Sequence, residues 1–154
     1  MKIEEKLKDL GIRIPESYIS IANYIPVSRD GNILYLSGTG PSRGNEAICS
    51  GKLGADISVE EGYQAARLAA VNVLAMLKQE LGDLDRVDRI LQMIGYINST
   101  ADFNSHPTVL DGASDLFAEV FGDMGKHSRA AIGVNSLPMG LPIEIVVTAK
   151  CKSL

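Results

Sequence analysis

The segment "SRAAIGVNSLP" contains the side chain best suited to ligand chemistry, the guanidinium of Arg129. Alternate residues of a β-strand share a face, so Arg129, Ala131 and Gly133 lie on one face and Ala130 and Ile132 on the other. We expect the second, apolar face to belong to the core. The first face is then a shallow floor of small side chains with one guanidinium above it, which leaves space for a ligand or another subunit.

A planar guanidinium binds a carboxylate through two parallel hydrogen bonds, so Arg129 is a candidate anchor for a small carboxylate. The alternative is an ion pair at a subunit boundary, with Glu144 or Asp111 as its partner. Glu144 lies on the next strand and shares a face with Val146 and Thr148, and by sequence alone a solvent-exposed position suits it better. The residues by themselves leave a ligand site and a structural ion pair open.

The other reactive side chains lack the spacing of a known site. Cys49 and Cys151 form no metal-ligand pattern with His106 and His127, so we expect no bound metal. Each histidine stands alone in a loop, where a surface or capping role is the simpler interpretation. The segments "GTGPSRG" and "SGKLG" complete neither common phosphate-binding motif, and we expect no cofactor.

The overall composition indicates a single soluble domain. A chain of 154 residues can bury a core without metals or disulfides, and its two cysteines are typical of a reducing, cytoplasmic environment. The net charge of -4 argues against a nucleic-acid surface, which needs clustered lysine and arginine. The chain begins without a signal-peptide core, and no apolar run is long enough for a membrane span.

Turn and capping signals divide the chain into helices and strands. The dipeptide Asp30-Gly31 predicts a hairpin, and Pro26 places its first strand at a sheet edge, because proline cannot donate to a neighbouring strand. Ser58 and Glu61 predict the start of a long helix, and Gly82 its end. After a short helix at 1–11, the expected elements are two strands within 23–38, a long irregular loop at 38–56, helices at 58–82 and 107–122, and strands at 89–97, 128–135 and 143–151.

This order of elements favours an α+β fold, with one mixed β-sheet and both long helices packed on a single face. We expect Arg129, Ala131 and Gly133 on the face that the helices leave open. An identical subunit is then needed to cover that face, with clefts between subunits.

Four motifs, "NILYLSGTGP", "LDGASDLFAEVF", "SRAAIGVNSLP" and "PIEIVVTA", resemble the YjgF/RidA family, also called the L-PSP endoribonuclease-like family. The resemblance runs from about Asn23 to Ala149, which makes 1–154 a single YjgF/RidA-like domain with 1–16 as an N-terminal helical extension. It implies a chorismate mutase-like fold and a homotrimer with ligand clefts between subunits. The longer loop and the extension are typical of a less characterised branch.

The best-understood branch hydrolyses reactive 2-imino acids and enamines to 2-oxo acids and ammonia without a protein-bound cofactor, and the resemblance implies the same reaction here. Arg129 matches the arginine that binds the substrate carboxylate, and Glu144 matches the glutamate near the attacking water. Tyr24 matches a cleft tyrosine, and Ser37 and Gly38 match the cleft serine and its following glycine.

Two candidate substrate-binding positions depart from the deaminase pattern. Ala131 stands where deaminases often have cysteine, and Asp111 where they have asparagine. A protein that binds or senses a small carboxylate metabolite without turning it over is the alternative function. Endoribonuclease activity, which the family name suggests, is the weakest alternative, because the chain is acidic and has no histidine pair.

Overall fold

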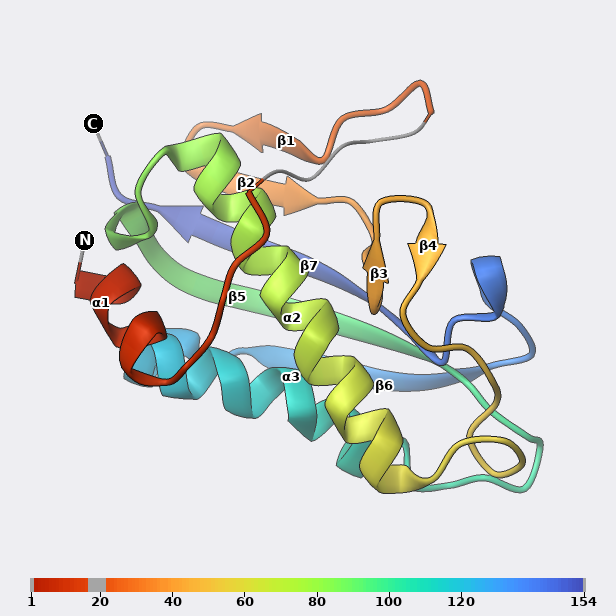
Figure 1. Cartoon of the computed structure of the whole chain (residues 1–154). Helices are drawn as coiled ribbons and strands as arrows, with labels where there is room; N and C mark the ends of the chain where they lie inside the picture. The colour runs from red at the N-terminus through yellow and green to blue at the C-terminus, as the bar shows by residue number, and fades with distance from the viewer. Residues whose placement is uncertain (1, 17–21, 154) are drawn as a thin grey trace.

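The computed structural model describes residues 2–16 and 22–153, and their long helices lie on one side of a five-stranded β-sheet (Figure 1). This arrangement confirms the α+β architecture. In chain order the elements are α1 (Lys2–Asp9), β1 (Val27–Asp30), β2 (Ile33–Leu36), β3 (Ser42–Arg43), β4 (Glu46–Ala47), α2 (Val59–Leu81), η1 (Leu84–Arg86), β5 (Val87–Asn98), α3 (His106–Phe121), η2 (Gly122–Gly125), β6 (Ser128–Val134), η3 (Pro138–Gly140) and β7 (Ile143–Cys151).

The strand order in the sheet is β1-β2-β7-β5-β6. Strand β6 runs parallel to β5 while the other neighbours pair antiparallel, which confirms the mixed sheet. Strand β1 forms one edge, as Pro26 predicted, and β6 forms the other. Strand β7, the last in the sequence, lies at the centre of the sheet between β2 and β5.

Helix α2 begins with the predicted capping box. Glu61 N donates to Ser58 Oγ (3.1 Å), and Ser58 N donates to Glu61 Oε2 (2.8 Å). The helix ends before Gly82, whose φ of 77° lies in the region that glycine adopts readily. It packs closely along α3, where a Cβ at Gly112 would collide with the carbonyl of Tyr63. The apolar residues of both helices are buried against the same face of the sheet.

Strand β6 presents its two faces in the opposite sense to our prediction. Arg129 donates to side chains of α3, and a Cβ at Gly133 would lie 2.5 Å from His106 Nε2 at the start of that helix. Ile132 on the other face is 42% exposed. The expectation that Arg129, Ala131 and Gly133 lie on the uncovered face is therefore wrong. Ala131 and Gly133 do not form an open floor; their small size allows α3 to pack close to the sheet.

The expected irregular loop contains the short β3–β4 hairpin. Asn72 of α2 fixes its base, because Asn72 Nδ2 donates to the carbonyls of Gly40 and Ser42, both at 2.9 Å. Farther along the same loop, Lys52 Nζ donates to Asn98 Oδ1 (2.8 Å) at the end of β5. Both ends of the loop are thus attached to the folded core.

The N-terminal extension is helical only in its first part. Helix α1 ends at Asp9, and Gly11 follows with a φ of 68°. Leu7 is buried, whereas Leu10 is 42% exposed.

Candidate functional site

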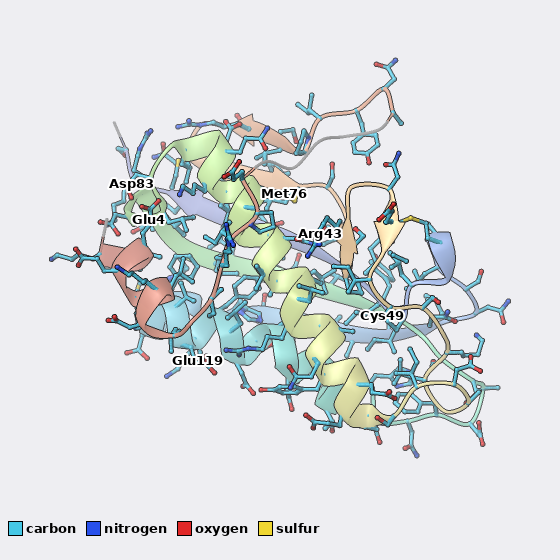
Figure 2. All side chains as sticks on the ribbon, viewed as in Figure 1. Glu4, Arg43, Cys49, Met76, Asp83 and Glu119 are labelled. Atoms are coloured by element: carbon cyan, nitrogen blue, oxygen red, sulfur yellow. The ribbon has the colours of Figure 1, made fainter. Side chains whose placement is uncertain are left out.

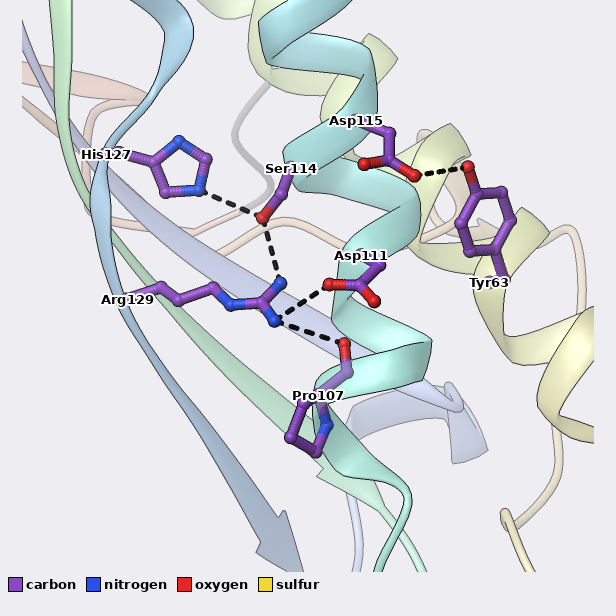
Figure 3. A network of polar contacts seen from close by, with 7 residues as sticks. All are labelled: Tyr63, Pro107, Asp111, Ser114, Asp115, His127 and Arg129. Carbon is purple, nitrogen blue, oxygen red and sulfur yellow. Dashed lines mark hydrogen bonds and ion pairs between the residues drawn. The ribbon is translucent and has the colours of Figure 1, made fainter.

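Arg129 on β6 is held by helix α3, as Figure 3 shows. Its Nη2 lies 2.8 Å from Asp111 Oδ1, and its Nη1 donates to Ser114 Oγ at 3.0 Å. A longer hydrogen bond of 3.4 Å runs from Nη2 to the carbonyl of Pro107. The ion pair is partly open to solvent, since the side chains of Arg129 and Asp111 are 27% and 46% exposed. Two successive turns of α3 therefore orient the guanidinium while leaving it accessible.

His127 extends this network behind the arginine. Its Nδ1 lies 2.6 Å from the carbonyl of Gly125, and its Nε2 lies 3.1 Å from Ser114 Oγ. A carbonyl can only accept, so Nδ1 carries the proton and Nε2 accepts from the Ser114 hydroxyl. That hydroxyl is left to accept from Arg129, which is the contact observed.

Burial lowers the pKa of His127, the hydrogen bond to Gly125 opposes this shift, and the charge of Arg129 adds a smaller lowering effect. The ring also packs edge-on against Phe117, with centroids 5.7 Å apart. A neutral imidazole with both nitrogens in use is suited to positioning Arg129 through Ser114. The expected surface or capping role does not describe this half-buried ring.

Glu144 lies away from Arg129, on the face of β7 that the helices do not cover. Its neighbours Ile143 and Ile145 point into the core, so alternation places Glu144 on the open side. It lines a cavity of about 160 Å³ together with Tyr24, Gly38 and other residues. Burial raises the pKa of the Glu144 carboxyl. A half-buried carboxyl with a raised pKa is typical of acid–base sites.

A side chain at position 38 would displace this carboxylate. A Cβ at Gly38 would collide with Glu144 Oε1 and lie 3.0 Å from Glu144 Cδ. Ser37 uses its groups elsewhere: its Oγ donates to the Ile25 carbonyl (2.7 Å), and its N donates to the Pro26 carbonyl (2.8 Å). Ser37 therefore holds the segment that follows Tyr24.

The structure thus divides the sequence-derived candidates into two groups. Arg129 contacts Asp111 under the helices, and Ala131 follows on the same face of β6. Glu144 joins Tyr24 and Gly38 on the opposite face of the sheet. Within one chain, no single small substrate can contact both Arg129 and Glu144.

Three residues of these two groups were not among the candidates. Ser114 lies three residues after Asp111, which places both on one face of α3, and this spacing was a usable signal. His127, just before β6, contacts Ser114 in the middle of α3, and no local sequence pattern indicates that these two residues meet. Met139 lines the Glu144 cavity and has a φ of 58°, which is unusual for a residue with a side chain.

Two absences apply to the described residues, 2–16 and 22–153. They contain no group of three or more histidine, cysteine or acidic side chains placed to hold a metal ion. No helix among them is long and apolar enough to cross a membrane.

Comparisons with known proteins agree with this fold. Protein TCP17 of Trypanosoma cruzi is 37% identical over 145 residues, which span 94% of this chain and 91% of that protein. The crystal structure of Atu1372 from Agrobacterium tumefaciens is 38% identical, with a TM-score of 0.90 over 97% of this chain and 92% of that one. A protein of Shewanella oneidensis MR-1, described as a "putative endoribonuclease", is 38% identical with a TM-score of 0.91, covering 96% and 98% of the two chains.

A more distant structure, E. coli TdcF with bound serine, shares the fold at 23% identity and a TM-score of 0.58, over 89% of this chain and 94% of that one. Residues 4–148 match the family model described as "YjgF/chorismate mutase-like, putative endoribonuclease". With nearly the whole chain inside that match, this protein belongs to the YjgF/chorismate mutase-like family.

Proposed function

We propose that this protein hydrolyses reactive 2-imino acids and their enamine tautomers to 2-oxo acids and ammonia, in clefts between identical subunits. The placement of Arg129 and Glu144 on opposite faces of one sheet is the observation that carries this proposal. One group is suited to binding a carboxylate and the other to moving a proton. Two chains are needed to bring them to the same substrate.

Arg129 supplies the substrate anchor. Asp111 already contacts the guanidinium through Nη2, and the pair is partly exposed, so a substrate carboxylate can reach a group that binds carboxylates well. An incoming substrate carboxylate takes the place of Asp111 or shares the guanidinium with it. Ser114 and His127 keep the side chain in place during this exchange. Fixing the substrate lowers the entropic cost of the reaction.

Glu144 supplies the proton transfer. Water adds to the imine carbon, its oxygen forming the new bond while the C=N electron pair moves to nitrogen. Glu144 accepts the proton of the water and returns it to nitrogen. In the resulting carbinolamine the hydroxyl proton passes to nitrogen through Glu144, the C–N bond breaks, and ammonia leaves as the hydroxyl oxygen becomes the carbonyl of the 2-oxo acid. The raised pKa of Glu144 brings it nearer to neutrality, where a group both accepts and releases a proton efficiently.

The open face of the sheet supports an oligomer. It carries apolar side chains on four strands, and the most exposed of them, Tyr35 and Ile132, are 50% and 42% accessible in the single chain. A second copy packed there would bury them and form a cleft at the boundary. We propose a homotrimer, for which light scattering should give three times the 16.5 kDa chain mass. A stable, active monomer would contradict the shared cleft.

The reaction is tested by generating imino acids in situ with an amino-acid oxidase. Release of ammonia and 2-oxo acid is followed with and without the protein, and the proposal requires acceleration that depends on Arg129. Saturable binding of a 2-oxo acid without acceleration would support the carboxylate-binding alternative.

An RNA substrate is a poorer match. The net charge of -4 opposes binding to a polyanion. His106 and His127 contact different serines, Ser99 (3.2 Å) and Ser114 (3.1 Å), so they do not form the paired acid and base of a histidine-dependent ribonuclease. RNA cleavage by the pure protein, lost in Arg129→Met and Glu144→Gln, would reverse this conclusion.

A further inference from the structure

A basic cavity lies on α2, away from Arg129. Its volume is about 350 Å³, and it is bounded by the chain after α1, the β3–β4 hairpin and the middle turns of α2. Figure 2 shows Arg43 of the hairpin beside α2. Arg13 reaches the same cavity from the N-terminal segment, while Leu68, Val71 and Ala75 of α2 supply an apolar wall.

The two arginines differ from the others in this chain. The sequence has seven, and five of them donate to a carbonyl, carboxylate, hydroxyl or thioether group of the structure. Within residues 2–16 and 22–153, Arg13 and Arg43 make no such contact, and both are exposed at this cavity. Glu46 pairs with Arg43 across the hairpin in the strand register, yet the two form no ion pair. Among the described residues, no carboxylate lines the cavity.

Asn72 of α2 fixes the hairpin that carries Arg43. Asn72 is 4% exposed and holds the hairpin by its two hydrogen bonds to Gly40 and Ser42. Gly44, with a φ of 59°, turns the chain directly after Arg43. Two cationic side chains from separate segments, Arg13 and Arg43, thus lie at one cavity, where an anion would be attracted by both charges.

We propose that this cavity binds a small organic anion, a carboxylate or phosphate that carries a short apolar group. The anionic head contacts Arg13 and Arg43, since guanidinium groups bind both kinds of oxyanion through paired hydrogen bonds. The apolar part packs on Leu68 and Val71. The volume lies at the lower end of the range for small-molecule pockets. This cavity adjoins the Glu144 cavity, with which it shares Ser42 and Gly44, but Arg13 and Arg43 do not line the Glu144 cavity. The proposal therefore does not depend on the catalytic reaction.

Isothermal titration calorimetry with hexyl phosphate and hexanoate tests the proposal and distinguishes the two head groups. We expect saturable binding of at least one probe, weaker binding of inorganic phosphate, and no binding of hexanol. Equal affinity for inorganic phosphate and hexyl phosphate would refute the role of the apolar wall, and binding of neither probe would overturn the site.

Variants assign the binding to this cavity. Arg13→Gln and Arg43→Gln should each weaken it by about tenfold to a hundredfold, the range for one charge-assisted hydrogen bond. Arg29→Gln is the matched control, because Arg29 is an exposed arginine on β1 that lies outside this cavity and donates to the Gly31 carbonyl in its own turn. Full affinity in the double variant of Arg13 and Arg43 would overturn the proposal. Loss of binding in Arg129→Gln would place the probe in the other cleft and would overturn it as well.

Discussion

Mixed oligomers test whether Arg129 and Glu144 act in one cleft from two chains. Arg129→Met and Glu144→Gln are each expected to be nearly inactive, with the second losing about a hundredfold in turnover, as expected for lost acid–base help. Co-expression at equal levels assembles the two kinds of chain at random. Half of the arginine positions and half of the glutamate positions are then intact, so about one quarter of the clefts hold both natural residues in a ring of any size.

The assay is 2-oxo acid release by the co-expressed mixture, purified through one affinity tag that both kinds of chain carry, so that every oligomer is recovered. We expect about one quarter of wild-type turnover, well above either parent. A mixture of wild type with the double variant is the matched control. This control mixture should keep about one quarter of wild-type turnover if the cleft is shared between chains, and about one half if the site lies within one chain. Activity of the first mixture no higher than that of its parents, with about one half in the control, would refute the shared cleft.

Three further variants test individual contacts. Asp111→Asn removes the competing carboxylate, and because the ion pair is partly exposed we expect 2-oxo acid affinity to rise by no more than about fivefold in calorimetry; weaker binding would show that Asp111 helps to hold the ligand. Gly38→Ala displaces the flexible end of Glu144, so turnover should fall by about tenfold to a hundredfold while the thermal unfolding midpoint stays near wild type; unchanged turnover would remove Glu144 from the reaction. The third variant concerns folding stability. Because burial raises the pKa of Glu144, the protonated carboxyl contributes favourably to the free energy of unfolding below the usual glutamate pKa, and this contribution is lost as the pH rises through the raised pKa. Glu144→Gln should therefore match wild type in denaturant unfolding at low pH and exceed it near neutrality, and a lower stability at neutral pH would contradict a desolvated carboxylate.

Local signals in the sequence were sufficient for most of the fold. The Ser58 capping box and the edge position indicated by Pro26 were predictable because each depends on neighbours in the chain. The packing of α2 and α3 on one face was predictable from the order of helices and strands. The orientation of β6 was not. Alternation separates the two faces of a strand but does not say which is covered, and small residues on both faces of β6 removed the usual contrast.

The candidate site depends on longer-range geometry. The parallel register that aligns Arg129 with Met93 brings the guanidinium under α3, and only then do Ser114 and His127 become its neighbours. Of the sequence candidates, Tyr24 does share a cavity with Glu144. The left-handed backbone at Met139 could not be predicted from the sequence, because methionine does not favour a positive φ.

The central position of β7 has a consequence for folding during synthesis. A ribosome produces β1, β2, β5 and β6 before β7, so the growing chain holds two separate pieces of sheet, each with an unpaired inner edge. Only the final strand joins them, by pairing with β2 on one side and β5 on the other. Premature termination before Ile143 would therefore leave two exposed edges that invite pairing between chains, and such fragments should aggregate instead of persisting as a smaller folded protein.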